Sequence, residues 1–286
     1  MKGKRVGFVT YLTSSEVTAS DTFLVSAIER LGGLVDSAPW DSPQVDWQKY
    51  DVLILRSCWN YHTKYFAFLK WLEHIETLGI HVWNPPAILR WNMDKSYLLS
   101  LNQKGIQIVP TSIITARREN SIENIFEEME SNKLVLKPAI GASAYEVHKI
   151  NVEDGEKNLT ILSSLLLHSD VLIQPFMEEI YDGEISLIFI GNTFTHAVMK
   201  TPKGNEFRVN HNGTAKLISV DQSIIEQGQH ILNTIEKPIL YARIDGLLVN
   251  KKFVLMELEL IEPHLFIDLC PETADVFATE FAAHEQ

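Results

Sequence analysis

Two apolar segments near the C-terminal end of the chain carry acidic residues in a regular pattern that is typical of a β-hairpin. Residues 241–249 and 253–260 are the two segments, and Asn250-Lys-Lys separates them. Because side chains alternate faces along a strand, Glu257 and Glu259 should project from one face. The apolar residues between and beside them should project from the other face; these are Met256, Leu258 and Leu260. The sequence therefore predicts an antiparallel pair with one acidic and one apolar face.

The length of the turn decides whether a third acid joins the acidic face. If residues 250–252 form a three-residue turn, Asp245 lies opposite Glu257 and three carboxylates converge. A two-residue turn would pair Asp245 with Met256 instead. Crowded carboxylates repel one another unless a cation neutralises them, and oxygen ligands suit a hard ion such as Mg²⁺. Two interpretations stay open: a metal site, or a solvent-facing sheet edge on which alternating acids are ordinary.

Composition limits the class of protein. The chain has 286 residues, 45% of them hydrophobic and 22% charged, which is typical of a soluble globular protein with two or three domains. Its formal net charge of -12 opposes binding to the phosphate backbone of a nucleic acid. No apolar stretch approaches the roughly 20 residues of a membrane span, and residues 6–9 are too few for a signal-peptide core. With only Cys58 and Cys270, we expect a cytoplasmic protein. The oligomeric state stays open, with a homodimer as one option.

Strands and helices alternate over the first 85 residues, which favours an α/β domain with a small parallel sheet. The expected strands are 5–10, 51–56 and 80–83, and the expected helices are 21–31, with Asp21 as N-cap, and 66–75. The breaker Asn84-Pro-Pro closes this region. Next, a helix from Trp91 to Gly105 should lead into an α+β unit and then a larger antiparallel sheet. We therefore expect domains at 1–87, 88–175 and 176–286.

Three further segments offer groups that suit an anionic ligand. Lys137 ends an apolar strand before the turn Gly141-Ala-Ser, whose backbone N–H groups can approach phosphate oxygens, although such turns often only connect elements. Lys95 lies at an expected helix start, where the helix dipole disfavours a cation, so it either attracts an anion or is a solvated surface residue. Arg208 and His211 lie in a polar loop, and the arginine fork fits carboxylate or phosphate.

The order of these pieces changes their interpretation. The series runs from Asp-Lys95 through Leu-Lys137-Pro and its loop, Gln174-Pro-Phe-Met, Arg208-x-Asn before a glycine, to Asp245 and Glu257-x-Glu. It resembles the ATP-grasp superfamily over about residues 90 to 280, with the first 85 residues similar to the usual N-terminal, pre-ATP-grasp domain. Within the superfamily, the chain is similar to the glutathione synthetase and RimK-like branch, and especially to the O-ureidoserine cyclo-ligase group of cycloserine biosynthesis. That closer similarity rests on Arg56-Ser-Cys-Trp-Asn-Tyr, Asn84-Pro-Pro, Arg90-Trp-Asn and Met256-Glu-Leu-Glu-Leu-Ile-Glu-Pro.

The resemblance implies an ATP-grasp fold, with ATP between a small lobe at 88–175 and a large lobe at 176–286. Lys95 and Lys137 would hold the phosphates, beneath a loop formed by Gly141, Ala142 and Ser143. The hinge that would read the adenine edge consists of Gln174, Pro175, Phe176 and Met177, with Glu178 or Glu184 at the ribose. The carboxylates that would hold two Mg²⁺ ions, or Mn²⁺ in their place, are Asp245, Glu257 and Glu259. Many relatives have asparagine at the position of Glu259, which leaves the number of tightly bound metals open.

The resemblance further implies a carboxylate–amine ligase. A substrate carboxylate would attack the γ-phosphate of ATP, and an amine would displace phosphate from the resulting acyl phosphate, with Lys137, Arg208 and Asn210 as the catalytic residues. The substrate would be a small amino-acid-like molecule. Its expected contacts are Arg56, Trp59, Asn60, Tyr61 and His211, because loops after parallel strands form binding crevices. Packing of Trp59 and Tyr61 against the neighbouring lobe is the structural alternative.

Two other functions stay open. Some relatives phosphorylate a hydroxyl group or transfer phosphate through histidine, and this chain has His196, His211 and His264. A nucleotide sensor without activity is the other alternative, and it would require the loss of catalytic groups that this chain retains. Whether the two reacting groups belong to one molecule, giving a ring, or to two molecules is not readable from the sequence.

Overall fold

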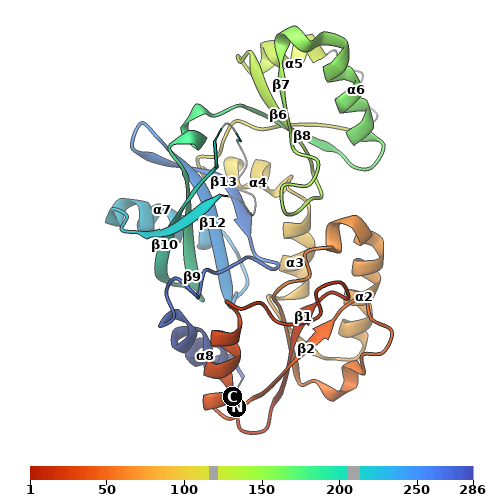
Figure 1. Ribbon diagram of the computed structural model, residues 1–286, viewed down its shortest axis with the longest axis vertical. Coiled ribbons are helices and arrows are strands. Elements are labelled where there is room, and N and C mark those ends of the chain that lie inside the picture. Colours follow the sequence, from red (N-terminus) through yellow and green to blue (C-terminus); the bar gives the residue numbers. More distant parts are fainter. Residues whose placement is uncertain (116–121, 205, 207–212, 286) are drawn as a thin grey trace.

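The computed structural model describes residues 1–115, 122–204, 206 and 213–285. Within these ranges the strands form three sheets, each built from one part of the chain (Figure 1). The predicted order, a parallel sheet followed by antiparallel sheets, is confirmed. Each sheet falls within one of the three expected domains, whose limits stay predictions. None of the helices in the described ranges combines the length and the hydropathy needed to cross a bilayer.

The first sheet has the order β2-β1-β3-β4, and its strands are parallel. The strands are β1 (Arg5–Thr10), β2 (Leu34–Pro39), β3 (Val52–Leu55) and β4 (His81–Trp83). Alternate residues of β1 pack against different helices: Val6 and Phe8 against α1 (Thr22–Arg30) and α8 (Thr273–His284), and Val9 against α2 (Tyr65–Thr77). A parallel sheet needs cover on both faces, so the C-terminal helix α8 completes the N-terminal domain.

The second sheet, β5-β8-β6-β7, is antiparallel. Its strands are β5 (Ser112–Ile114), β6 (Lys133–Pro138), β7 (His148–Asn151) and β8 (Val171–Pro175). Leu134 and Leu136 of β6 pack with helices α5 (Ile122–Glu128) and α6 (Gly155–Leu166). Because faces alternate along a strand, Val135 and Lys137 project from the other face, toward the third sheet.

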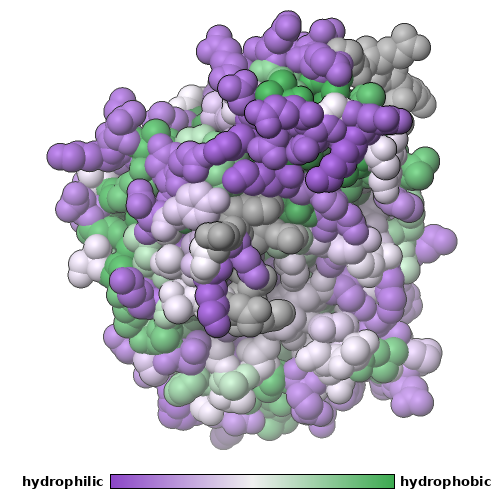
Figure 2. Space-filling view, turned by 45° about the horizontal axis from the view of Figure 1, so that its top comes forward, coloured by the Kyte–Doolittle hydropathy of each residue, from purple (hydrophilic) through white to green (hydrophobic). Residues whose placement is uncertain are grey.

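The third sheet, β11-β10-β9-β12-β13, is antiparallel and carries the acidic hairpin. Its strands are β9 (Glu184–Ile190), β10 (Thr193–Thr201), β11 (Thr214–Ile218), β12 (Tyr241–Val249) and β13 (Lys252–Glu259). Its apolar face packs with helices α4 (Tyr97–Gln103) and α7 (Gln222–Leu232). Figure 2 shows hydrophilic side chains in a broad band on one face of the molecule, with hydrophobic side chains in separate areas. The larger apolar clusters are therefore internal, between sheets and helices.

The acidic hairpin has the shorter of the two turns considered, but it keeps the pairing expected for the longer one. Asn250 and Lys251, both with positive φ (51° and 64°), form a two-residue turn between Val249 and Lys252, but Asp245 does not pair with Met256 as expected for that turn. The register then shifts between Gly246 and Asp245, and this bulge restores the predicted pairing of Asp245 with Glu257.

Met256 is the extra residue of the bulge. It packs near Phe176 and Leu247, so the expectation that it projects from the apolar face with Leu258 was wrong. A bulge places two successive side chains opposite one partner residue, which breaks the alternation on which that expectation depended.

The single helix expected from Trp91 to Gly105 is two helices, α3 (Pro86–Met93) and α4. Asp94 between them is extended (φ -102°, ψ 115°), and its carboxylate accepts a hydrogen bond from the Ser96 backbone N–H at 2.9 Å. Lys95 thus lies in the link before α4, and its backbone N–H donates to Ala139 O at 2.8 Å. Local hydrogen bonding by Asp94 competes with helix formation here, which the apolar spacing did not reveal.

Candidate active site

The second and third sheets meet at a site with an apolar and a charged part. The apolar part contains Val135 from β6, Phe176 after β8, and Leu247 and Met256 from the hairpin. In the charged part, Lys95 Nζ lies 2.8 Å from Glu257 Oε1 and donates to Gly141 O at 2.5 Å. Residues from the link, from β6 and its loop, and from β13 are therefore brought together as the sequence pattern predicted.

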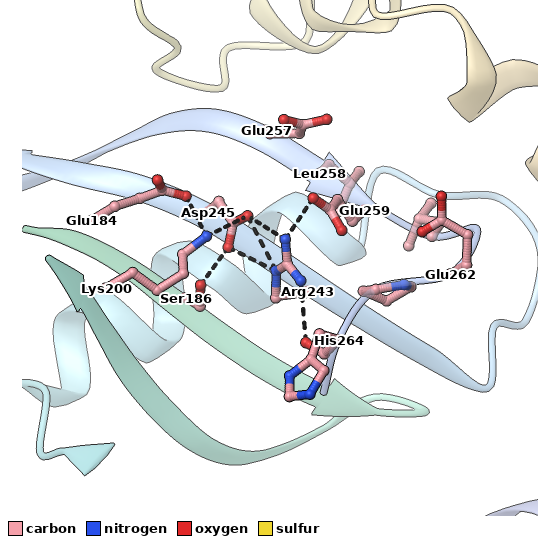
Figure 3. Close-up of polar contacts among 12 residues, drawn as sticks. Glu184, Ser186, Lys200, Arg243, Asp245, Glu257, Leu258, Glu259, Glu262 and His264 are labelled. Carbon is pink, nitrogen blue, oxygen red and sulfur yellow. Dashed lines mark hydrogen bonds and ion pairs between the residues drawn. The ribbon is translucent and has the colours of Figure 1, made fainter. Parts of the chain in front are cut away.

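The acidic face of the hairpin is held by cations (Figure 3). Arg243 Nη2 lies 2.9 Å from Asp245 Oδ2 and 2.5 Å from Glu259 Oε1. Lys200 of β10 lies 3.1 Å from Asp245 and 2.6 Å from Glu184. Asp245 also accepts a hydrogen bond from Ser186 Oγ at 2.5 Å. Alternation on β12 places Arg243 and Asp245 on the same face, so each acid has a cationic neighbour.

The pKa values record how tightly charge is packed there. Burial, with the neighbouring acids Glu257 and Asp245, raises the pKa of Glu259 to about 8, although Arg243 opposes the shift. Asp245 is buried too, but Arg243 and Lys200 outweigh burial and hold its pKa well below the ordinary value. Lys95 and Lys137 likewise outweigh burial at Glu257 and lower its pKa. At Glu259 the pair with Arg243 therefore does not outweigh burial and the neighbouring acids, and the neutral form of this carboxyl is favoured.

The donor atoms of these carboxylates suit a hard cation, although the side chains are not arranged as a complete coordination site. Asp245, Glu257 and Glu259 offer only oxygen donors on one face, which fits Mg²⁺ or Mn²⁺. Across the described residues, no three histidine, cysteine or acidic side chains are arranged to enclose a metal. Arg243 and Lys200 lie among the carboxylates instead. The assignment of these acids as metal ligands stays a prediction that the donor set supports.

Lys137 is the most unusual cation of the site. Its side chain is buried, at 8% exposure, and has no hydrogen bond or ion pair with any residue that the structure describes. Burial, with the charge of Lys95, lowers its pKa, although Glu257 opposes the shift. A buried ammonium without a partner costs free energy, so this position favours an anionic ligand. Ala142 of the adjoining loop packs against the N-terminal domain, next to this lysine.

The predicted hinge joins the two lobes. The Gln174 side chain donates to Thr111 Oγ1 at 2.9 Å, and Pro175 ends β8. Phe176 N–H donates to Lys133 O at 2.8 Å, which fixes the chain as it leaves the second sheet. Phe176 and Met177 then enter the apolar part of the site. The hinge therefore borders the apolar part of the site.

The two ribose candidates lie in different places. The carboxylate of Glu178 pairs with Lys133 at 2.7 Å, and its side chain is 60% exposed. Glu184 belongs to the charged part, where burial and Asp245 raise its pKa against the effect of Lys200. Both roles stay predictions, and the location favours Glu184.

The residues expected to contact substrate from the N-terminal domain are bound to the protein itself. Arg56 is fully buried, pairs with Asp21 at 2.9 Å and donates to Pro263 O at 3.0 Å. Trp59 Nε1 donates to Glu262 O at 3.3 Å. These contacts favour a positioning role, and a contact with substrate stays a prediction. They also explain why Asp21, although it precedes α1, does not cap that helix with its side chain.

Asn60 and Tyr61 are likewise engaged. Asn60 accepts from Trp40 Nε1 at 2.7 Å and donates to Asp41 Oδ2 at 2.9 Å, and Tyr61 is buried in the core beneath α2. The predicted roles of Arg208, Asn210 and His211 lie outside the described residues.

Three charged residues of the site were not singled out from the sequence: Lys200, Arg243 and Glu262. Alternation could have found Arg243, because Arg243-Ile-Asp places it beside Asp245 on the same strand face. Lys200 reaches Asp245 from β10, across the intervening β9, which no local pattern reveals. Glu262 is buried but follows the end of β13, so the alternation of the strand does not reveal it.

Comparison with known families agrees with this architecture. Residues 95–263 match the ATP-grasp domain of prokaryotic glutathione synthetase, and residues 6–84 match the N-terminal domain of D-cycloserine synthetase DcsG. The chain therefore belongs to the glutathione synthetase-type ATP-grasp family, and it is an ATP-grasp ligase. It is similar to the cycloserine biosynthesis protein DcsG of Streptomyces lavendulae, with 24% identity over 91% of each chain.

Solved structures share the fold, which confirms the predicted ATP-grasp architecture. The crystal structure of D-cycloserine synthetase DcsG superposes with a TM-score of 0.88 at 21% identity, covering 99% of this chain and 100% of the other. D-alanine–D-alanine ligase from Bacillus anthracis in complex with ATP gives 0.71 at 15% identity, with 98% and 95% covered. The ATP-grasp ligase PsnB with a precursor variant, Mg and ADP gives 0.66 at 12% identity, with 100% of each chain covered. ATP, ADP and Mg are thus ligands of proteins with this fold.

Proposed function

We propose that this ligase joins the carboxylate of a small amino-acid-like molecule to an amine, using ATP and releasing ADP and phosphate. The observation that carries the proposal is Lys137, a buried ammonium with no partner in the described chain, beside the Lys95–Glu257 ion pair. Two lysines at the meeting of the lobes suit a polyanion such as a triphosphate. The likeness to DcsG supports ring closure within one molecule as the form to test first.

Different residues of the site would bind the adenine ring, the phosphates and the metal ion. The apolar side chains of Phe176, Met177, Leu247 and Met256 offer a surface for the adenine ring, and the hinge backbone its polar edge. Lys95 and Lys137 lie where they can neutralise phosphate oxygens. Mg²⁺, when bound by Asp245, Glu257 and Glu259, would neutralise the negative charge that the acids and the phosphates share.

The reaction we propose has two steps. A carboxylate oxygen of the substrate forms a bond to the γ-phosphorus, and the bond to ADP breaks, giving an acyl phosphate. The amine then attacks the acyl carbon and loses a proton, and phosphate leaves with its bonding electrons. The cations of this chain stabilise negative charge in both steps by position, and neither step requires a protein nucleophile.

The histidines within the described residues do not favour the phosphotransfer alternative. His196 is buried, its Nε2–H donates to Leu265 O at 3.1 Å, and its Nδ1 contacts Thr195 and Thr273. His264 Nδ1 accepts from the Phe266 backbone N–H at 3.2 Å. Both rings therefore have structural partners.

The proposal is tested by incubating the protein with ATP, Mg²⁺, hydroxylamine and a panel of amino-acid-like carboxylates. A ligase should release ADP and form an acyl hydroxamate with at least one carboxylate, and mass analysis without hydroxylamine should distinguish a cyclic from a linear product. A phosphorylated hydroxyl product would favour the kinase instead, and the absence of carboxylate-dependent ADP release would refute the ligase.

The acidic face is tested by Glu257→Gln, with Glu226→Gln on the exposed surface of α7 as the matched control. We expect the Glu257 variant to lose at least about 10-fold in Mg²⁺-dependent turnover, because a charged ligand and the partner of Lys95 are both lost. Unchanged turnover in the Glu257 variant would refute the placement of the metal site at this hairpin.

A further inference from the structure

Glu262 is a buried acid whose carboxylate has no partner among the described residues. Among the residues described, four acidic side chains are buried: Asp21, Asp245, Glu262 and Glu285. Three of them form ion pairs, Asp21 with Arg56, Asp245 with Arg243 and Lys200, and Glu285 with Lys4. The carboxylate of Glu262 has neither an ion pair nor a hydrogen bond within the described chain, although its residue is only 7% exposed.

The cations around Glu262 are already engaged. The positive charges that act to lower its pKa are Arg243, Lys95 and Arg56. Arg243 is bound to Asp245 and Glu259, Lys95 to Glu257, and Arg56 to Asp21. Burial, with the charge of Glu257, raises the pKa of Glu262 to about 7 despite these cations. The position therefore lacks one positive charge that the described residues do not supply.

The backbone that carries Glu262 is fixed at every residue. Six successive carbonyl oxygens, those of residues 260–265, each lie within hydrogen-bond distance of a side-chain donor, and the single O–H of Tyr241 is shared between Ile261 O and Leu55 O. In order along the segment, the donors are Asn84, Tyr241, Trp59, Arg56, Arg243 and His196. We name residues 260–265 the carbonyl clamp. It fixes the backbone of Glu262 before any ligand binds.

The carboxylate of Glu262 is buried but not completely enclosed. Some side-chain oxygen and nitrogen atoms of the protein are fully buried and have no hydrogen-bond partner, but the carboxylate oxygens of Glu262 are not among them. The carboxylate therefore keeps some contact with solvent. Figure 3 shows Glu262 beyond the end of β13, in a row with Glu257 and Glu259. Trp59 of the N-terminal domain contacts the backbone of Glu262 from the other side. Glu262 thus lies between the acidic face and the N-terminal domain.

We propose that Glu262 binds the cationic amino group of the amino-acid-like substrate, and that the carbonyl clamp positions it for this contact. The inference rests on the proposed function, because that function supplies a substrate with an amino group. A single ammonium satisfies a single carboxylate, whereas Mg²⁺ requires several oxygen ligands. Glu262 would then determine specificity, and Trp59 would be a positioning residue.

The experiment measures binding by calorimetry in the presence of Mg²⁺ and AMP-PNP, using pairs of acids that differ only in the amino group. The pairs are alanine with lactate and serine with glycerate, each as both enantiomers. Wild-type protein should bind the amino member of at least one pair about 10-fold or more tightly than the hydroxy member. In Glu262→Gln the two affinities should differ by no more than about 3-fold, with that of the hydroxy acid unchanged.

Two further variants serve as an independent test and as a control. Trp59→Phe keeps the aromatic packing but removes the donor to Glu262 O, so it should reduce the ratio of the two affinities by about 2- to 10-fold without changing the affinity for hydroxy acid. Glu226→Gln removes a charge from the surface of α7 and should leave the ratio unchanged. If Glu262→Gln does not fold, the ratio measured for Trp59→Phe decides.

Three outcomes would overturn the inference. The first is that wild-type protein binds both members of every pair equally, or binds neither. The second is that Glu262→Gln loses the same affinity for both members of a pair. The third is that this variant loses affinity for AMP-PNP, which would make Glu262 part of the nucleotide or metal site. The binding assay needs no turnover. Failure of the ligase proposal would show separately, as missing carboxylate-dependent ADP release by the wild-type protein.

Discussion

Lys137 and Glu262 carry opposite charges in the same situation, since both are buried and neither has a partner in the described chain. Their neighbours Lys95, Arg243 and Asp245 are paired at distances between 2.5 and 3.1 Å. Leaving a charge buried and unpaired destabilises the free protein, so a bound ligand that completes the pair recovers free energy. At the scale of single residues, the missing partners therefore support our proposal that an anion binds at Lys137 and a cation at Glu262.

Replacing Lys137 tests this argument by separating stability from binding. Lys137→Met keeps the length of the side chain but removes its charge, so the ligand-free protein should be as stable as wild type or more stable, by about 1 kcal/mol. The affinity for ATP or AMP-PNP should fall by about 10-fold or more. Chemical denaturation and calorimetry measure the two quantities.

The matched control is Lys133→Met, on the same strand, whose lysine is exposed and paired with Glu178. Nucleotide affinity should be nearly unchanged in this variant. A large loss of stability in Lys137→Met, with nucleotide affinity retained, would show that Lys137 serves the fold rather than the ligand.

At the scale of elements, the hairpin shows what alternation can and cannot predict. The pattern of apolar and acidic residues predicted both strands and the face shared by Glu257 and Glu259, because side-chain direction follows from strand geometry. It could not predict the bulge at Met256, because a bulge changes the count of residues without changing their kind. Asp245 faces Glu257 only because a shorter turn and a bulge compensate each other.

The prediction of one continuous helix from Trp91 to Gly105 was wrong for a related reason. The break between α3 and α4 depends on Asp94 bonding to Ser96 and on Lys95 bonding to Ala139, a residue more than 40 positions away. Sequence motifs therefore identified Lys95 and Lys137 as site residues, but not the local structure that presents Lys95. A motif identifies the residue types that the chemistry requires. The backbone hydrogen bonds depend instead on which distant segments of the chain pack together, and a local motif does not show this.

The two-residue turn of the hairpin offers a prediction at the same scale. Lys251 has a φ of 64°, a conformation that costs a residue with a side chain about 1 kcal/mol but suits glycine. Lys251→Gly should therefore raise the free energy of unfolding by about 0.5–1 kcal/mol. Lys252→Gly, one residue later and within β13, should lower it by a similar amount, since glycine weakens a strand. Urea titrations of both variants check the signs, and stabilisation by the second rather than the first would contradict the turn geometry.

At the scale of the whole molecule, the N-terminal domain and the large lobe are joined by polar contacts that span most of the sequence. Arg56 donates to Pro263 O, and Trp59 donates to Glu262 O, so two residues expected to contact substrate also hold the carbonyl clamp. The motifs that carry the similarity to the cycloserine group thus act together across domains. The sequence could show that these residues belong together, but not that their partners would be backbone carbonyls, because any residue type supplies a carbonyl.

The chain termini meet at another such contact, which predicts how stability depends on pH. Figure 1 shows the two ends side by side, and the Glu285 carboxylate after α8 accepts from Lys4 Nζ at 2.7 Å, His81 Nδ1 at 2.6 Å and Trp83 Nε1 at 3.0 Å. Burial alone would raise the pKa of Glu285, but the hydrogen bonds from His81, Lys4 and Trp83 outweigh it and lower the pKa to about 2. Between an ordinary pKa near 4.5 and this value, the unfolded chain binds the proton and the folded chain does not.

Glu285 therefore stabilises the fold fully above about pH 5, and its contribution of about 2 kcal/mol disappears as the pH falls toward 2. In Glu285→Gln the free energy of unfolding should be lower than in wild type at pH 6 by about that amount, and the difference should shrink steadily down to pH 3. Guanidinium titrations at several pH values measure this difference. Glu280→Gln, at a more exposed position of the same helix, should differ from wild type by less than about 0.5 kcal/mol throughout. A difference for Glu285→Gln that does not change with pH would mean that the carboxylate charge does not join the termini, and that packing of α8 against α1 alone completes the N-terminal domain.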